Sequence, residues 1–403
     1  VLSVAACIPL SGWLADRFGV RNTFLSAIII FTLASLGCGL SQSLNQLLFF
    51  RVIQGVGGAL LLPVGRLSLL KIIPRTQFLA AMSLMSLAGL LGPLAGPTLG
   101  GWLVEVATWH WIFLINIPMG VLGILMTLKV MPNVKEPTVK TFDLIGFVLL
   151  VVAMIGWSLG IEHLASPEYS KWFSISLLVV GVVATLWYAY HSHTHQNALF
   201  RSRLFRNKIY AIGILGNFFA RFGGNALPFV LPLMLQVAFG FEPFIAGLMM
   251  IPLVLGSLFS KPIVRPIIQK MGYRRFLLVN TTLVGLCIAS FAIMTVDTPT
   301  WFRALHFFLF GTLNSLQFVG MNTLTLKDLP QQDASSGNSF LSMIMMLSMS
   351  IGVALAGTLI NIFTDYYGTA HVTTAFHVTL ICLGCINIIT ALIFWQIPKN
   401  TPV

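Results

Sequence analysis

Charged residues are scarce in this chain. Asp, Glu, Lys and Arg make up only 8% of its 403 residues, whereas 57% of the residues are hydrophobic. A soluble domain carries about 25% charged residues, because they cover its water-facing surface. The mean hydropathy of +0.91 agrees with this shortage. The composition therefore excludes a water-soluble globular protein and predicts a chain that has lipid as its solvent.

Acidic residues are the scarcest charged group, with 11 against 23 Lys and Arg, and the net charge is +12. Such an excess could attract nucleic acid, but the basic residues are distributed among loops between apolar runs. We therefore expect no nucleic-acid partner. The five cysteines all lie in apolar runs, which argues against a disulfide framework. No Lys follows a Gly, so the chain has no G-x-x-x-x-G-K phosphate loop and cannot pump on ATP by itself.

Apolar runs separated by polar breaks account for most of the chain. Most of them reach the ~20 apolar residues that cross a hydrocarbon core of ~30 Å, and their frequent Gly and Pro are typical of transmembrane helices. The sequence therefore predicts an all-α polytopic membrane protein. Its thirteen expected segments lie near 1–12, 22–41, 45–65, 78–101, 109–131, 143–161, 172–190, 209–238, 243–264, 275–296, 301–326, 336–363 and 372–396. Because the first run is too short to span a bilayer, we expect the chain to begin inside a helix.

The basic residues predict the orientation of these segments. We assume that successive segments cross the membrane in alternate directions. Of the 23 basic residues, Lys171 and Arg303 then lie on one side of the membrane, and Arg51 and Arg221 lie within spans. The other 19 fall on the opposite side: Arg17, Arg21, Arg66, Lys71, Arg75, Lys129, Lys135, Lys140, Arg201, Arg203, Arg206, Lys208, Lys261, Arg265, Lys270, Arg274, Arg275, Lys327 and Lys399. The positive-inside rule assigns that side, and with it the C-terminus, to the cytoplasm.

A weak internal repeat predicts the organisation. DRFGVRNTFL at 16–25 recurs as QKMGYRRFLL at 269–278, an offset of 253. At an offset of 256, Gly55, Lys71, Pro74, Gly96 and Gly101 recur as Gly311, Lys327, Pro330, Gly352 and Gly357. The repeat pairs the first five segments with the last five. We therefore predict an N-terminal half at 1–131 that lacks its first helix, an inserted two-helix linker with a cytoplasmic loop at 132–208, and a C-terminal half at 209–403.

Four stretches resemble signatures of the major facilitator superfamily. GWLADRFGVR at 12–21 resembles its loop signature G-x-L-A-D-R-x-G-R-R, with Val20 at one basic position, and RVIQGVGGA at 51–59 resembles R-x-x-Q-G-x-G-x-A of helix four. GPLAGPTLGG at 92–101 resembles the antiporter signature of helix five. WHWIFLINIPMG at 109–120, together with the inserted pair, resembles the fourteen-span drug:proton antiporters. The resemblance covers essentially the whole chain and implies two six-helix halves plus two inserted helices, built as parallel repeats.

The resemblance assigns two groups of residues to conformational change. The gating loop comprises Gly12, Asp16, Arg17, Gly19 and Arg21. There, Asp16 would hold a helix end through charge and dipole contacts, and the two arginines would pair with nearby acids. A solvated loop that only sets topology is the alternative.

The antiporter motif comprises Gly92, Gly96, Pro97, Gly100 and Gly101. Its glycines at every fourth position share one helix face, where they allow close approach of a neighbouring helix. The interpretation is either plain packing or a seam that flexes between the halves.

The resemblance implies that Arg51, with Gln54 one turn later, takes part in proton coupling. A charged residue inside a span costs at least ~2.5–3.5 kcal/mol, so it normally faces an interior partner, although Arg51 could instead reach the outer surface. All 11 acidic residues fall in loops or at expected helix ends. The resemblance therefore implies that the proton-carrying aspartate belongs to the first helix, upstream of this sequence.

Polar residues within two later segments predict a substrate cavity. Asn217, Arg221 and Asn225 recur one turn apart on one helix face, and Arg221 lies near the expected midplane. Gln236, Asn314 and Gln317 complete the set. Polar packing inside the bundle is the alternative for the amides. Arg221 could hold a carboxylate through two parallel hydrogen bonds.

These observations predict a proton-coupled secondary efflux transporter, a multidrug or small-molecule:proton antiporter that works by alternating access in the bacterial inner membrane. We expect no cofactor or metal besides the proton gradient, and as partners the bilayer, protons and a small-molecule substrate, with the protein a monomer. An exporter of small organic anions such as carboxylates is the alternative, since two arginines and no visible acid lie within the spans. A channel or a membrane-embedded enzyme also stays open.

Overall fold

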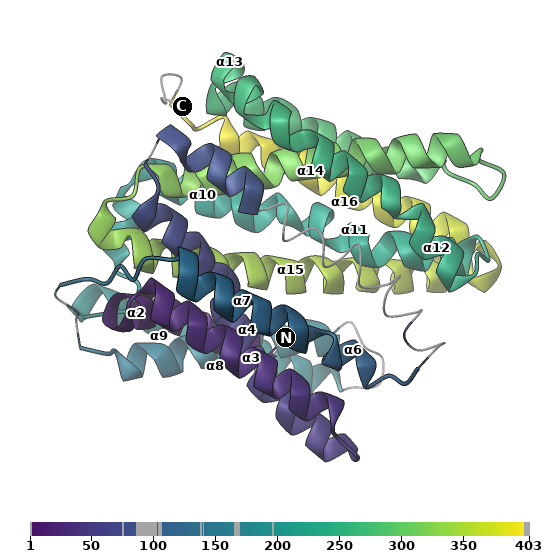
Figure 1. Ribbon diagram of the computed structural model, residues 1–403. Helices are drawn as coiled ribbons and strands as arrows, with labels where there is room; N and C mark the ends of the chain where they lie inside the picture. Colours follow the sequence, from purple (N-terminus) through teal and green to yellow (C-terminus); the bar gives the residue numbers. More distant parts are fainter. Residues whose placement is uncertain are drawn as a thin grey trace.

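The computed structural model describes residues 2–74, 76–85, 103, 107–137, 139, 141–164, 170–195 and 197–398, and over these residues it contains helices and no strands. The main helices are α1 (Leu2–Cys7), α2 (Leu10–Phe18), α3 (Val20–Gly39), α4 (Leu44–Ile72), α6 (Trp111–Leu114), α7 (Asn116–Val130), α8 (Leu144–Leu164), α9 (Lys171–Thr194), α10 (Lys208–Phe219), α11 (Arg221–Leu233), α12 (Pro243–Met249), α13 (Ile251–Ser290), α14 (Thr300–Lys327), α15 (Gln331–Tyr367) and α16 (Val372–Phe394). Figure 1 shows them as one elongated bundle. Ten helical stretches of the described residues are long and apolar enough to cross a membrane. The prediction of an all-α polytopic membrane protein is confirmed.

Two glycines mark equivalent turns in the repeat. Gly19 separates α2 from α3 with φ 88° and ψ 152°, and Gly272 interrupts α13 with φ 74° and ψ 156°. A positive φ of this kind favours glycine because a Cβ would be strained there. The 40-residue α13 is therefore two helices joined at Gly272, in agreement with the two segments expected near 243–264 and 275–296.

Helix packing repeats as well. A Cβ added at Gly55 on α4 would collide with Ser3 on α1, and one added at Gly311 on α14 would collide with the backbone of Leu253 on α13. Gly55 and Gly311 are partners in the sequence repeat. Gly55 allows α4 to approach α1 closely, and Gly311 allows α14 to approach α13 in the equivalent way. We refer to α1–α7 as the N-terminal half and to α10–α16 as the C-terminal half.

The turn between α2 and α3 lies at one end of the bundle, on the left in Figure 1. We call it the basic end. Here α15 of the C-terminal half packs against α2 and α4 of the N-terminal half. Ser11 and Ser339 hydroxyls lie 2.8 Å apart, and the Asn338 amide donates to the Pro63 carbonyl at 2.7 Å. The halves are thus held together at the basic end by these polar contacts and by an apolar cluster that includes Ala5 and Ile8 of one half and Tyr210 and Leu341 of the other.

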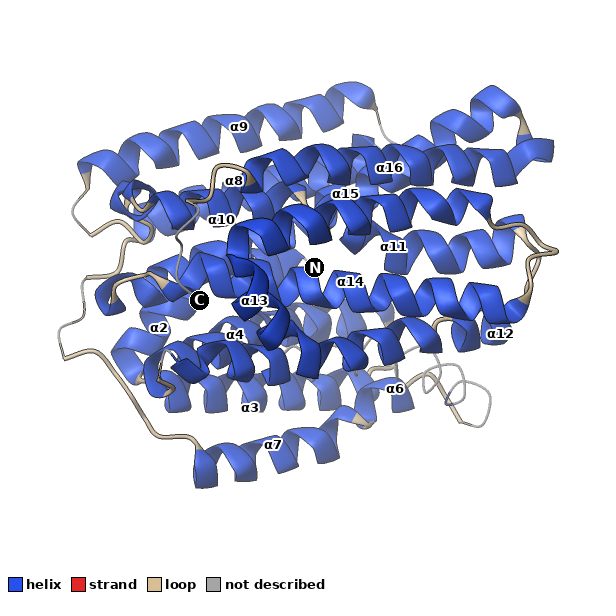
Figure 2. Cartoon of the chain, turned by 90° about the horizontal axis from the view of Figure 1, so that it is seen from above, coloured by secondary structure: helices blue, strands red, loops and turns tan. Residues whose placement is uncertain are grey.

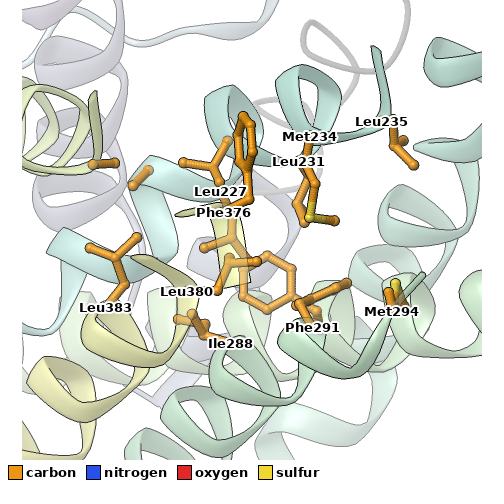
Figure 3. Close-up of a cluster of buried hydrophobic side chains, with 14 of the residues drawn as sticks. Leu227, Leu231, Met234, Leu235, Ile288, Phe291, Met294, Phe376, Leu380 and Leu383 are labelled. Atoms are coloured by element: carbon orange, nitrogen blue, oxygen red, sulfur yellow. The ribbon is translucent and has the colours of Figure 1, made fainter. Parts of the chain in front are cut away.

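The opposite end of the C-terminal half has its own apolar core. Buried side chains from α11, α13 and α16 meet there, among them Leu227, Leu231, Phe291 and Phe376 (Figure 3). The described residues of this cluster all come from the C-terminal half. This end of the C-terminal half therefore has a core of its own.

The inserted helices α8 and α9 pack on each other and lie along one edge of the bundle (Figure 2). A Cβ at Gly156 would lie 2.7 Å from the Gly181 backbone nitrogen, so the two helices approach closely. Helix α8 contacts α1 and α15, and therefore touches both halves. At its basic end, Asp143 caps α8 by accepting from the Gly146 backbone N–H at 2.8 Å, and it pairs with His191 of α9 at 2.9 Å.

Candidate functional site

An ion-pair cluster lies where the two halves meet at the basic end. Lys71, in the last turn of α4, places its Nζ 2.7 Å from Asp16 Oδ1 and 2.8 Å from Glu136 Oε1. The Lys71 side chain is fully buried, whereas the acids are 23% and 29% exposed. Asp16 Oδ1 also accepts a hydrogen bond from Ser335 Oγ near the start of α15. We call Asp16, Lys71, Glu136 and Ser335 the gate cluster.

The gating-loop residues predicted from the sequence take different places around this cluster. Asp16 joins it directly, and a Cβ at Gly12 would lie 2.8 Å from the Ser335 carbonyl oxygen, so α2 touches α15 closely there. Arg17 and Arg21 do not form the expected ion pairs within the described part of the chain. Arg17 instead lies 5.4 Å above the Trp13 ring, and Arg21 Nε is buried without a hydrogen-bond partner. Lys71 takes their place because it extends from the neighbouring helix into the acids.

The repeat shows that this cluster is specific to the N-terminal half. The counterpart of Asp16 is Gln269, and the counterpart of Lys71 is Lys327. Lys327 Nζ lies 4.8 Å from the centre of the Tyr273 ring, and Gln269 carries no charge with which to form the equivalent of the Asp16–Lys71 ion pair. In the sequence, Lys71 stood out only because it matches Lys327 in the internal repeat, and that match did not indicate a role in gating.

Arg51 and Gln54 form the start of a short polar chain. Arg51 Nη1 donates to Gln54 Oε1 at 3.0 Å, and Gln54 Nε2 donates to Ser35 Oγ at 2.7 Å. Arg51 is exposed and lies 5.0 Å from the centre of the Phe113 ring, whereas Gln54 is buried. Among the described residues no carboxylate forms an ion pair with Arg51.

Arg221 is buried and hydrogen-bonded within the C-terminal half. It begins α11, directly after the break at Ala220, and is 5% exposed. Its Nε donates to Asn217 Oδ1 at 3.0 Å and its Nη2 to Asn322 Oδ1 at 3.1 Å. These two nitrogens form the edge with which a guanidinium grips a carboxylate. Because both donate to amides, this edge of Arg221 is already occupied, and the carboxylate-binding role of Arg221 stays a prediction.

The other predicted cavity residues do not form one group. Gln317 faces α13, where it accepts from Asn280 at 2.8 Å and donates to Thr281 at 2.6 Å, on another side of α14 from Arg221. Asn314 lies against Gly224, close to Arg221. Asn225 and Gln236 are half-buried on α11 and the π-helical turn Met234–Ala238.

Asn322 and Thr325 were missing from the sequence prediction although both join the network around Arg221. Thr325 Oγ1 accepts from Asn217 at 3.1 Å. Their spacing on α14 places them on the Asn314 face, a pattern that the sequence contains but that does not identify the facing helix.

Arg66 is a correction to the predicted topology. We assigned it to a loop, but it lies inside α4 and is only 1% exposed. Its Nη1 lies 3.5 Å from Met345 Sδ on α15, while Nε and Nη2 are buried without hydrogen-bond partners. Lys261 also lies inside a helix, α13, with its Nζ 2.7 Å from Ser315 Oγ. The misassignment of Arg66 has a simple cause: α4 continues past the apolar run at 45–65 that predicted it, whereas Lys261 lies within the segment expected near 243–264.

The antiporter motif, Gly92, Gly96, Pro97, Gly100 and Gly101, lies outside the described residues. Its counterparts in the second half are Ser348, Gly352 and Ala356 on α15, and all three are buried. Ser348 Oγ donates to the Phe218 carbonyl at 2.6 Å, and a Cβ at Gly352 would lie 2.7 Å from the Phe222 carbonyl. In the C-terminal half this small-residue stripe therefore brings α15 close to α10 and α11.

Two repeated helical halves with broken helices and buried arginines between them are typical of secondary membrane transporters. A family model described as Major Facilitator Superfamily matches residues 1–353. The chain therefore belongs to the major facilitator superfamily, a family of transporters, and is not an enzyme.

Bacterial relatives match the whole chain. It is 50% identical over 410 residues to the "Putative multidrug resistance protein MdtD" of Escherichia coli O6:H1, and covers 86% of that relative. The relative of the same name from Enterobacter sp. (strain 638) is 48% identical over 406 residues, again with all of this chain and 86% of the relative covered.

Solved structures support the fold. The human organic anion transporter MFSD10 superposes with a TM-score of 0.68 at 14% identity, covering 98% of this chain and 81% of that one. The proton:xylose symporter XylE superposes with a TM-score of 0.64 at 14% identity, covering 98% and 84%. At such identities the likeness concerns the fold alone.

Proposed function

We propose that the protein is a proton-coupled exporter of small molecules that works by alternating access. The observation that carries this proposal is the seam at the basic end, where α15 meets α2 and α4 through hydrogen bonds and the gate cluster. Such contacts are individually modest, so they can break and re-form during a cycle. In this proposal the basic end faces the cytoplasm of the bacterial inner membrane, and the structure corresponds to a state closed toward the cytoplasm.

Within this proposal, Arg51 and Gln54 take part in proton coupling. Arg51 is a cation about seven residues inside α4 and hydrogen-bonds to the buried Gln54, so its charge can act on a nearby proton-carrying acid. The pairing orients the guanidinium in a region where charge is costly. The resemblance to drug:proton antiporters motivates the direction of transport, and the relatives named for multidrug resistance motivate a lipophilic substrate.

A second candidate function, export of small organic anions, is favoured by a specific observation. Arg66 and Arg221 are both at most 5% exposed, and among the described residues no carboxylate forms an ion pair with either. Buried cations of this kind repel a cationic guest and attract an anionic one. We expect a monomer in both cases.

Transport by the intact protein in inside-out membrane vesicles tests the proposal. A pH-sensitive dye inside vesicles energised with an acid interior should report proton efflux when an exported compound is added outside. Saturable, substrate-dependent alkalinisation that disappears with a protonophore is expected. Substrate flux that continues unchanged without a proton gradient would contradict coupling, and flux that does not saturate would indicate a channel.

A further inference from the structure

Arg66 presents an unpaired donor edge at the seam between the halves. Its Nε and Nη2 are both buried and make no hydrogen bond, and Nη1 has only the Met345 sulfur at 3.5 Å. Sulfur is a weak acceptor, so it satisfies little of the charge. A guanidinium is always protonated, and a buried charge without a partner is strongly unfavourable. The site therefore lacks an acceptor.

The geometry of this edge selects the acceptor. Nε–H and the adjacent Nη2–H of a guanidinium point the same way and form a fork that matches the two oxygens of a carboxylate. On Arg221 the same edge is occupied by Asn217 and Asn322. On Arg66 it is free. The free edge thus belongs to Arg66, which the sequence did not predict as a substrate-binding residue.

The surroundings of Arg66 also favour an anion. Arg221 is a second buried arginine, and Asn322, which accepts a hydrogen bond from it, has its Nδ2 buried without a partner. The described ion pairs involve neither arginine. Two cations and a surplus of donors would be balanced by a group that carries negative charge and accepts hydrogen bonds.

The position of Arg66 links this edge to the gate. Arg66 follows Pro63 on α4 by about one turn, and the Pro63 carbonyl accepts from Asn338 of α15. The next contact along the same two helices joins Arg66 to Met345. In the alternating-access cycle proposed above, separation of α15 from α4 at the basic end would uncover Arg66 toward that side, and closure would bury it again.

We propose that Arg66 is the substrate-binding residue for a carboxylate, which its Nε and Nη2 grip at the seam between α4 and α15. The inference rests on the transport function proposed above and assigns its substrate class. A carboxylate on Arg66 neutralises the charge that closure must bury, so a loaded carrier closes the basic end more readily than an empty one. Arg221 and its amides position the second half and are not the primary ligand.

Ligand-induced thermal stabilisation of the intact protein in detergent tests this inference without any gradient. The probes are acetate, succinate and tricarballylate, with one, two and three carboxylates, and neutral succinamide as the control compound. At least one carboxylate should raise the Tm, while succinamide should not. Arg66→Lys keeps the charge but loses the fork, so the half-maximal concentration should rise at least tenfold.

Two further variants separate binding from folding. Arg66→Met removes the buried charge, so its Tm without ligand should equal or exceed that of the unmodified protein, and carboxylates should no longer raise it. Arg206→Lys changes an exposed arginine of the linker at the same end and should behave like the unmodified protein. Full carboxylate stabilisation in both Arg66 variants would overturn the inference.

The two proposals fail in different ways. If no carboxylate stabilises the unmodified protein while proton-driven efflux of a dye is normal, Arg66 is not a carboxylate site but the exporter stands. If carboxylates bind through Arg66 and no compound moves protons in vesicles, the site stands and the proposed coupling falls.

Discussion

Ser335→Ala removes the hydrogen bond by which α15 reaches Asp16 of the gate cluster. A hydrogen bond to a charged group contributes about 1.5–3 kcal/mol. Asp16 keeps Lys71 at 2.7 Å and is 23% exposed, so water can replace part of the loss. The bond exists only when the halves are closed at the basic end. The variant should therefore lower the ratio of closed to open molecules by about 10- to 150-fold, taking ~1.4 kcal/mol per factor of ten.

Spin-label distances across the seam measure this ratio. Asn22 on α3 and Lys270 on α13 are both exposed at the basic end, one in each half, and can carry labels after the five native cysteines are replaced. Ser335→Ala should shift the distance distribution toward longer values. Ser336→Ala, one residue further along α15 where the side chain is half-buried, is the matched control and should leave it unchanged. Identical distributions for both variants would refute the idea that the Asp16–Ser335 bond holds the gate.

Three further predictions follow from the same contacts. Lys71→Met should lower the free energy of unfolding by about 1–3 kcal/mol, because it leaves two partly buried acids side by side, whereas Lys270→Met, which changes an exposed lysine at the same end, should cost less; equal losses in thermal unfolding would argue against the cluster. Arg51→Ala should abolish proton-driven transport in inside-out vesicles while leaving ligand-induced stabilisation intact; normal driven transport would show that Arg51 only reaches the surface. An impermeant thiol reagent outside intact cells should reach cysteines placed at 162–171 but not at 191–208, and labelling of the latter would reverse the proposed orientation.

The sequence by itself determined the fold class, the segments and the repeat. Lipid-length apolar runs leave the backbone little choice but helix, because each helix satisfies its own hydrogen bonds in lipid. Gly19 and Gly272 could be matched from local sequence alone, and both adopt the positive φ that glycine allows. Asp16 could likewise be predicted as a gating residue from local sequence, because the motif at 12–21 that contains it is contiguous. The role of the antiporter motif stays a prediction.

Only the tertiary structure decided which charges meet. Helical periodicity shows which residues share a face, but not which helix, often more than 100 residues away, covers that face. Thus Lys71 rather than Arg17 or Arg21 neutralises Asp16, and Gln317 turns toward α13, away from Arg221. Arg66 looked like a loop residue because a charge ends an apolar run, yet α15 packs over it. Burial of a charge depends on what the neighbouring half places against it, and that is a property of the assembled bundle alone.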